Sequence, residues 1–256
     1  MSDLRGKTIV ITGASQGIGE ATARHFADLG ATVVMAARNQ DRLDAIARDI
    51  SATGGRALPM ACDVSRPRDV QNLIADAVDA TGRVDVLVNN AGVIDPIARL
   101  ADSDPVAWGH VADINFKGVY HGLRYAIPAM LERDGGTIVN LSSGAATSEL
   151  EGWSHYCATK AAVLALTSVA DKEYRDQGIR VIGLSPGTVA TEMQTQIKAS
   201  GINPVSRLEP DAHISPDWVA RAIAWLTTPE ADAHLGTDFS IKTEAGRAAV
   251  GLPLVS

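Results

Sequence analysis

The sequence predicts an α/β fold built on a doubly wound parallel sheet, with helices on both faces, and two observations support this prediction. Short apolar runs rich in β-branched residues alternate with amphipathic stretches of helical length along most of the chain. The first of these runs leads directly into a glycine-rich turn that a helical pattern follows. Because no linker, repeat or low-complexity run interrupts the alternation, we expect one three-layer αβα domain over residues 1–256.

The composition limits the kind of partner that the chain can bind. With 46% hydrophobic and 21% charged residues among 256, the chain has the balance of an ordinary globular protein. Lys and Arg number 23 against 30 Asp and Glu, and the resulting net charge of −7 argues against a nucleic-acid partner. No apolar run is long enough to span a membrane, so no membrane association is expected.

The cysteines, the histidines and the start of the chain bear on location and metal binding. Cys62 and Cys157 form neither a disulfide framework nor a metal-binding spacing, and the six histidines do not cluster. The first apolar run is too short for a signal peptide and fits a strand. We therefore expect a reducing, cytoplasmic location and no metal site.

The glycine-rich turn after the first strand, at 7–12, predicts a phosphate site. Backbone N–H groups and the positive end of a helix dipole face an anion at such a turn, and the helical pattern extends to Leu29. The spacing is G-x-x-x-G-x-G, whereas the common Rossmann-type fingerprint is G-x-G-x-x-G, and a plain strand-to-helix turn is the alternative. The residues expected to contact a cofactor are Gly13, Ser15, Gln16, Gly17, Ile18 and Gly19.

The end of the second strand, at 32–36, indicates which dinucleotide is bound. In dinucleotide-binding folds this strand end meets the adenosine ribose, and an Asp or Glu there selects NAD. Here Ala37 takes the acidic place and Arg38 stands beside it. An Arg can bind a 2′-phosphate with two donors, and Ser15 can add a hydroxyl, so we expect NADP(H) to be preferred, with NAD(H) possible. The alternative is a surface Arg that precedes the helix at 40–52.

Two further strand ends carry candidate cofactor contacts. The strand at 56–61 is followed by Asp63 and Val64, which we expect at the edge of the adenine. The strand at 84–88 runs straight into two amides, an alanine and a glycine. Ligands bind beyond the carboxyl ends of strands in open α/β sheets, although Asn and Gly also favour ordinary tight turns. The candidates at this second strand end are Asn89, Ala91 and Gly92.

A long helical pattern at 104–133 contains an amide and a glycine in its middle, Asn115 and Gly118. Helix propensity disfavours both residues at such positions. The sequence therefore predicts one long helix, or two in series, with a local break that turns Asn115 toward the site.

The stretch Asn140–Lys160 predicts the chemistry. Tyr156 and Lys160 are four residues apart where a helix begins, so they lie on one helix face. An ammonium near a phenol lowers the tyrosine pKa, which favours acid/base catalysis near neutral pH. Ser143, after the preceding strand, is placed to donate a hydrogen bond into the same space. The alternative is a helix-start tyrosine and a solvated lysine.

The last third of the chain continues the alternation and then loosens. A helix to Gln177 and a strand at 179–184 complete a dinucleotide-binding core of about 5–190. The segment of about 191–216 mixes apolar and charged residues with prolines, and we interpret it as a substrate cover of short helices, with an ordinary long loop as the alternative. A helix at 217–228 and a short strand at 238–241 follow.

Together these motifs resemble the short-chain dehydrogenase/reductase family over nearly the whole chain. The resemblance implies a catalytic tetrad of Asn115, Ser143, Tyr156 and Lys160, in which Asn115 holds a water of a proton relay and Lys160 binds the nicotinamide ribose. It also implies NAD(P)-dependent hydride transfer between the nicotinamide and a carbonyl or alcohol carbon, and a homodimer or homotetramer. The cofactor contacts that it adds are Tyr156, Lys160, Pro186, Gly187, Val189 and Thr191.

The sequence departs from the family pattern at two places. Ser185 stands where the family often has Asn before Pro-Gly, and the end of the chain lacks the usual Val-Asp-Gly-Gly, which puts the usual tetramer contacts in doubt. We expect an NADP(H)-dependent carbonyl reductase. The alternatives are an NAD-dependent alcohol, sugar-alcohol or steroid dehydrogenase and, from another class, a non-catalytic dinucleotide sensor. The sequence names neither the substrate nor the physiological direction.

Overall fold

The computed structural model describes residues 4–254, and its sheet is parallel throughout, as predicted. Within that range seven strands form one sheet in the order β3-β2-β1-β4-β5-β6-β7, and every neighbouring pair is parallel. Residues 1–3 and 255–256 of the expected domain lie outside the described part. The strands are β1 (Thr8–Thr12), β2 (Thr32–Ala37), β3 (Arg56–Ala61), β4 (Val86–Asn89), β5 (Gly136–Leu141), β6 (Ile179–Ser185) and β7 (Asp238–Ser240).

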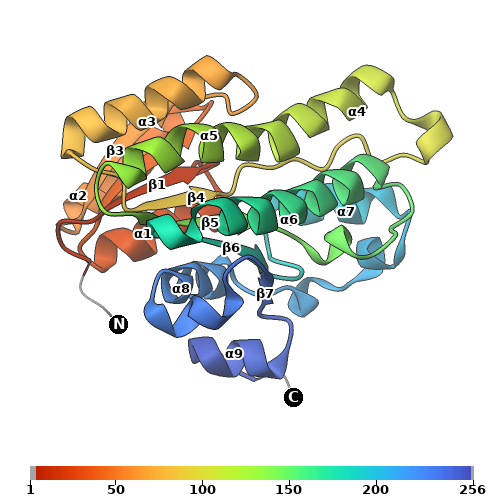
Figure 1. Cartoon of the computed structure of the whole chain (residues 1–256). Helices are drawn as coiled ribbons and strands as arrows, with labels where there is room; N and C mark the ends of the chain where they lie inside the picture. The colour runs from red at the N-terminus through yellow and green to blue at the C-terminus, as the bar shows by residue number, and fades with distance from the viewer. Residues whose placement is uncertain (1–3, 255–256) are drawn as a thin grey trace.

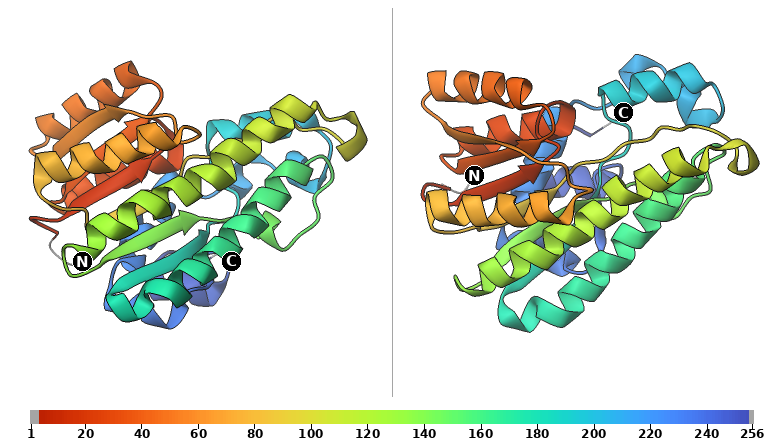
Figure 2. Two further views of the ribbon diagram at one scale, coloured as in Figure 1. Left: turned by 45° about the horizontal axis from the view of Figure 1, so that its top comes forward. Right: turned by 90° about the horizontal axis from the view of Figure 1, so that it is seen from above.

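Helices cover both faces of this sheet, so the predicted three-layer αβα arrangement is confirmed (Figures 1 and 2). Helices α1, α2 and α8 pack on one face, and α3, α5 and α6 on the other. None of the helices in the described range is long and apolar enough to cross a membrane. The α-helices are α1 (Gly17–Asp28), α2 (Gln40–Ala52), α3 (Pro67–Thr81), α4 (Pro105–Ala112), α5 (Gly118–Leu131), α6 (Ser154–Tyr174), α7 (Glu192–Ser200), α8 (Pro216–Leu226) and α9 (Glu244–Val250).

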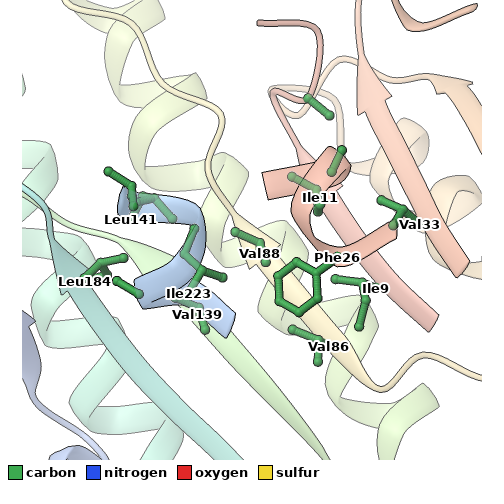
Figure 3. Packing of buried hydrophobic residues seen from close by; sticks show 14 of the residues in the cluster. Ile9, Ile11, Phe26, Val33, Val86, Val88, Val139, Leu141, Leu184 and Ile223 are labelled. Atoms are coloured by element: carbon green, nitrogen blue, oxygen red, sulfur yellow. The ribbon is translucent and has the colours of Figure 1, made fainter. Parts of the chain in front are cut away.

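The apolar core lies on the two faces of the sheet. Successive strand residues point to opposite faces, so Ile9 and Ile11 face α1 and α8 while Val10 faces α3 and α5. Figure 3 shows Phe26 of α1 and Ile223 of α8 packed over the first of these faces. All five of these side chains are fully buried, which explains why the strands are continuous apolar runs in the sequence.

The connectivity places a crevice at the carboxyl ends of the strands. β1 pairs with β2 on one side and with β4 on the other, so the strand order reverses at β1. The connections after β1 and β4 lead to helices on opposite faces of the sheet, and ligands are expected to bind beyond the ends of the strands at such a reversal. The sequence motifs follow the carboxyl ends of β1, β2, β4, β5 and β6, which gathers them along one edge.

Two helical segments differ from the sequence-based expectation. Helix α6 begins at Ser154, not at Tyr156, and continues as a short 3₁₀ turn to Gln177. Helix α9 was not predicted, because its 7 residues are too few to show a helical period. Thr243 starts it by accepting a hydrogen bond from the Gly246 N–H, a local N-cap that stabilises the first turn.

A chain of buried amides ties the centre of the sheet to α6. The Asn89 Nδ2 donates to Asn140 Oδ1 over 2.8 Å, and the Asn140 Nδ2 donates to the Thr167 hydroxyl over 3.0 Å. Helix α5 can lie above Asn89 because residue 122 is glycine, where a Cβ would be 2.2 Å from Asn89 Oδ1. The chain holds β4 and β5 at the spacing that their terminal loops need.

Asn140→Ala is expected to lower the free energy of unfolding by about 2 kcal/mol, because a buried donor left without a partner costs ~1–3 kcal/mol. Urea unfolding followed by circular dichroism measures the change. Asn72→Ala, at an exposed position on α3, is the matched control and should stay within about 0.5 kcal/mol of the unmodified chain. An equal effect of the two substitutions would contradict this account.

Candidate functional site

The glycine turn after β1 and the loop after β4 lie against each other. The Thr12 hydroxyl accepts hydrogen bonds from the N–H groups of Asn90 and Ala91, over 3.0 and 3.1 Å. Gly13 has a φ of 66°, and a Cβ there would lie 2.8 Å from the Cα of Ala91. A Cβ at Gly19 would lie 2.2 Å from the Gly13 carbonyl oxygen. Larger side chains at these two glycines would separate the loops, which explains the glycine spacing in the sequence.

The start of helix α1 can hold an anion. Gln16 precedes the helix in an extended conformation, and no side chain in the described range accepts from the first turn. The first backbone N–H groups of a helix have no partner within it, and the helix dipole makes them positive. The Gln16 side chain does not cap the helix, and its Oε1 accepts a hydrogen bond from the Arg42 guanidinium over 2.9 Å. Ser15, Gly17 and Ile18 surround this helix start, as the sequence predicts.

The adenosine end of the predicted site contains Arg38 and Asp63. Arg38 follows β2 and is exposed, and its charge acts on the Asp63 carboxyl after β3. Burial alone would raise the pKa of Asp63, but hydrogen bonds from Ser65 and the charges of Arg38 and Arg66 lower it below its usual value. Asp63 therefore stays ionised near neutral pH, and Val64 beside it is buried.

Asn115 lies in a π-helical segment, Asp113–Lys117, that joins α4 to α5. The segment is the local break that the sequence predicts. The Asn115 side chain is fully buried, accepts from the Val93 N–H and donates to the Val93 carbonyl, both over 2.8 Å. Because both ends of its amide are occupied, the side chain fixes the course of the loop after β4, next to Gly92.

Ser143, Tyr156 and Lys160 converge at the carboxyl end of β5. Ser143 precedes a short 3₁₀ turn, and its hydroxyl accepts from the Ala145 N–H. Tyr156 and Lys160 lie on one face of α6, with the Lys160 Nζ 5.5 Å from the centroid of the tyrosine ring. The Lys160 Nζ also donates to the Leu141 carbonyl over 2.6 Å. The spacing of four residues therefore brings the phenol and the ammonium together, with Ser143 beside the phenol.

The prediction that Lys160 lowers the pKa of Tyr156 is wrong for this structure. Burial raises the pKa of Tyr156 to about 12, and the neighbouring Ser143 hydroxyl lowers it only in part. Burial also lowers the pKa of Lys160 to about 8. The ammonium is directed to the Leu141 carbonyl, so burial decides the pKa of both side chains.

The loop after β6 lies at the same carboxyl edge of the sheet as the glycine turn. Pro186 is buried and Gly187 has a φ of 86°, a conformation that favours glycine. A Cβ at Gly17 would lie 3.0 Å from the Thr191 side chain, so this loop touches the glycine turn after β1. Val189 is anchored in the core and pairs with Ile214 as an isolated bridge.

An apolar cluster covers Tyr156, and the sequence did not point to it. Its buried members are Ile94, Ala145, Trp153, Tyr156 and Ile197, and the partly buried Ile97, Leu150, Cys157, Met193 and Val205 pack against them. The Trp153 ring meets the Tyr156 ring edge-on, with 5.6 Å between centroids. The only signal in the sequence was apolar residues in stretches without periodicity.

The segment expected to cover the substrate consists of short helices, as predicted. Helix α7 buries Ile197 against this cluster, and a 3₁₀ turn, Pro204–Arg207, follows. The Asn203 Nδ2 donates to the Glu151 carbonyl over 2.9 Å, which fastens the segment to the loop before α6.

The sequence of this chain matches a known protein family. The family model of short chain dehydrogenases matches residues 7–201. The chain is 38% identical over 244 residues to 3beta-hydroxysteroid dehydrogenase 1 of Eggerthella lenta, covering 92% of each chain.

Two solved structures are also similar. A variant of actinorhodin polyketide ketoreductase with NADPH has a TM-score of 0.85 and 27% identity, over 94% of this chain and 97% of that one. NAD⁺-bound xylitol dehydrogenase has a TM-score of 0.86 and 24% identity, over 94% and 99%, a likeness of fold.

Proposed function

Because the chain belongs to the short-chain dehydrogenase family, we propose that it is an NADP(H)-dependent carbonyl reductase in which Tyr156 supplies the proton. The observation that carries this proposal is the convergence of Ser143, Tyr156 and Lys160 at the carboxyl edge of the sheet. A phenol whose pKa is about 12 keeps its proton at neutral pH, which suits a donor in the reductive direction.

The residues along the crevice fit a dinucleotide. The first turn of α1 offers N–H groups to the pyrophosphate, and Gly13 and Gly19 leave room for it to approach the backbone. Arg38 and Asp63 flank the adenosine, and the loop containing Gly187 and Thr191 lies on the nicotinamide side. The cofactor, when bound, supplies the hydride.

Each tetrad residue has a separate task in this mechanism. The Ser143 hydroxyl donates to the carbonyl oxygen of the substrate and polarises it. Tyr156 gives its proton to the same oxygen as the hydride arrives. The Lys160 ammonium holds the ribose and replenishes the proton of Tyr156. Since the Asn115 side chain is fully engaged with Val93, its backbone carbonyl is the group that holds the relay water.

The substrate that fits best is an apolar ketone. The side chains that pack around Tyr156, among them Trp153 and Ile197, are aromatic and aliphatic, which favours an apolar substrate beside the phenol. Each CH₂ group that a substrate buries there contributes ~0.8 kcal/mol, so a six-carbon ring should be favoured over a two-carbon fragment by more than tenfold. A steroid dehydrogenase among the relatives agrees with this chemistry.

Turnover assays test the proposed function. The purified chain is incubated with NADPH or NADH and with alicyclic ketones, keto acids and sugars. We expect oxidation of NADPH with alicyclic ketones at a kcat/KM more than tenfold above that for the keto acids and sugars. Tight NADPH binding without turnover on any carbonyl would favour the dinucleotide sensor instead.

Arg38→Asp is expected to reverse the cofactor preference in kcat/KM from NADPH to NADH. Losing a charge-assisted contact to the 2′-phosphate costs about 1.5–3 kcal/mol, and the new carboxylate both repels the phosphate and accepts from the ribose hydroxyl of NADH. Arg42→Asp, on the same side of the crevice but paired with Gln16, is the matched control and should retain the preference. Equal use of both cofactors by the unmodified chain would contradict the proposal.

A homo-oligomer is expected, with α4–α5 and α6 as its interface. These helices run side by side across one face of the molecule (Figures 1 and 2). Tyr120 on α5 and Val169 on α6 are large apolar side chains that are 49% and 51% exposed. Light scattering at micromolar concentration should give a mass at least twice 26.8 kDa, and Val169→Asp should lower it. A monomer in the unmodified chain would refute the interface.

A further inference from the structure

A buried histidine next to Tyr156 holds the segment that follows β4. His155 is fully buried, and its Nε2 lies 2.6 Å from the Ile94 carbonyl oxygen. Because a carbonyl oxygen only accepts, this imidazole nitrogen carries the proton and donates. The other ring nitrogen, Nδ1, is enclosed and has no hydrogen-bond partner among the described residues. Within the described part of the chain, the Ile94 carbonyl is therefore the one polar partner of this imidazole.

This hydrogen bond joins two elements that carry the site. His155 lies in the first turn of α6, beside Tyr156, whereas Ile94 lies in the loop after β4, 61 residues earlier in the chain. The preceding residue, Val93, is held by both ends of the Asn115 amide, each over 2.8 Å. Two consecutive residues of this loop are thus fixed by side chains from two different helical segments.

The segment 93–98 meets the chain before α6 at a second place. The Ala98 N–H donates to the Gly152 carbonyl over 3.1 Å. Gly152 has a φ of 80°, and a Cβ there would lie 2.8 Å from Ile202 Cδ1 and 3.4 Å from Ile97 Cγ2, so glycine allows this close approach. Exchange of the Ala98 amide proton with solvent therefore reports whether the segment stays in place.

The Ile94 side chain is the part of this segment that belongs to the site. It is fully buried in the apolar cluster that includes Trp153 and Tyr156. A backbone that is fixed at the Ile94 carbonyl keeps this side chain in the cluster. Since an apolar substrate is proposed to bind beside the phenol, the place of the Ile94 side chain affects how much of the substrate is buried.

We propose that His155 is a positioning residue for substrate specificity, which keeps the Ile94 side chain beside Tyr156 by donating to the Ile94 carbonyl. Held there, the side chain favours an alicyclic ring over a small ketone. The proposal rests on the proposed function for the class of substrate. His155 takes no part in the proton transfer, because its Nε2 proton is engaged by the carbonyl and its ring is enclosed. Its effect is therefore on substrate binding and not on the chemical step.

The first measurement needs neither cofactor nor substrate. His155→Leu keeps a side chain of similar bulk but leaves the Ile94 carbonyl without its donor. Exchange of the Ala98 amide, followed by NMR in the full chain, should become about tenfold faster or more, because an unpaired buried carbonyl favours local opening. His155→Gln, whose amide N–H can reach the same carbonyl, should keep the exchange within about threefold of the unmodified rate.

The second measurement separates substrate binding from chemistry. At saturating NADPH, His155→Leu should raise the KM for cyclohexanone roughly tenfold, which corresponds to about two CH₂ groups left unburied, while kcat stays within about threefold. The ratio of kcat/KM for cyclohexanone to that for acetone should fall by a similar factor, because acetone has little surface to bury. His155→Gln should restore most of this ratio.

His121→Leu is the matched control. His121 on α5 is also a buried imidazole at a backbone carbonyl, with its Nδ1 2.8 Å from the Val64 oxygen. Its loss removes the same kind of hydrogen bond at the adenosine end of the crevice. At saturating NADPH it should therefore leave both the Ala98 exchange rate and the KM for cyclohexanone unchanged.

A double variant tests whether His155 acts through Ile94. Ile94→Ala removes the side chain that the hydrogen bond places, so it should lower the same specificity ratio. His155→Leu combined with Ile94→Ala should then lower the ratio no further than Ile94→Ala alone. Additive effects of the two substitutions would overturn the proposal.

Two other results would also overturn it. One is an unchanged Ala98 exchange rate and an unchanged KM in His155→Leu that is folded by circular dichroism. The other is an equal loss of kcat in His155→Leu and His155→Gln, which indicates a structural role alone. If His155→Leu does not fold, an unchanged specificity ratio in Ile94→Ala decides against the proposal. Faster Ala98 exchange in a chain that reduces no carbonyl supports the positioning of Ile94 and rejects the proposed function instead.

Discussion

Tyr156→Phe is expected to lower kcat by ~10²–10⁴, the usual contribution of a general acid. The substitution keeps the aromatic ring that packs edge-on against Trp153, so the apolar cluster should remain intact. It removes only the hydroxyl whose proton reaches the carbonyl oxygen. Binding of NADPH, measured by fluorescence titration, should change little, because the phenol is a minor contact of the cofactor.

A matched substitution separates catalysis from packing. Tyr174→Phe lies on the same helix, is partly buried against the core and is far from the crevice. It should retain full activity. If Tyr156→Phe keeps more than about a tenth of kcat, Tyr156 is not the acid. The neighbouring His155 is a poor substitute, because it is fully buried with its Nε2 at the Ile94 carbonyl.

Lys160→Met is expected to weaken NADPH binding by about 10- to 100-fold and to lower reductive kcat as well. Each hydrogen bond from a charged group contributes ~1.5–3 kcal/mol, and the ammonium is proposed to donate to the ribose. The unbranched methionine fills a similar volume, so the fold should be retained. Fluorescence titration with NADPH and steady-state kinetics measure the two effects.

The pH dependence of reductive kcat/KM distinguishes the role of Lys160 from that of Tyr156. Because its pKa is about 8, its proton is lost as the pH rises through that value, and reductive kcat/KM should fall there in the unmodified chain. In Lys160→Arg the guanidinium keeps its charge up to a pH of ~12, so the fall of reductive kcat/KM near pH 8 should disappear. The variant enzyme should also be less active. A decline that persists in Lys160→Arg would assign it to another group.

The sequence predicted that the Lys160 ammonium lowers the pKa of Tyr156, which would make loss of Lys160 move the pH optimum upward, but the structure does not support this effect. Burial raises the pKa of Tyr156 to about 12, and the hydrogen bond with Ser143 lowers it only in part. The titration that matters near neutral pH therefore belongs to the lysine.

Local patterns were sufficient for much of the fold. Helix α2 at Gln40–Ala52 and strand β3 at Arg56–Ala61 have the predicted bounds, because periodicity and turn residues are properties of neighbouring positions. The same holds for the break around Asn115, where an amide and a glycine disfavour a regular helix. Helix α9 was not predicted, since a segment of 7 residues is too short for its periodicity to be recognised.

By itself, the sequence determined the order of strands and helices and the loops that carry polar residues, and parallel strands then bring those loops to one edge. Only the tertiary structure decided that Trp153 and Ile197 would pack in one cluster with Tyr156. It also decided the pKa values of the tyrosine and the lysine. Both depend on how completely distant segments exclude water from a side chain, and desolvation is a property of the packed molecule that no local pattern of residues records.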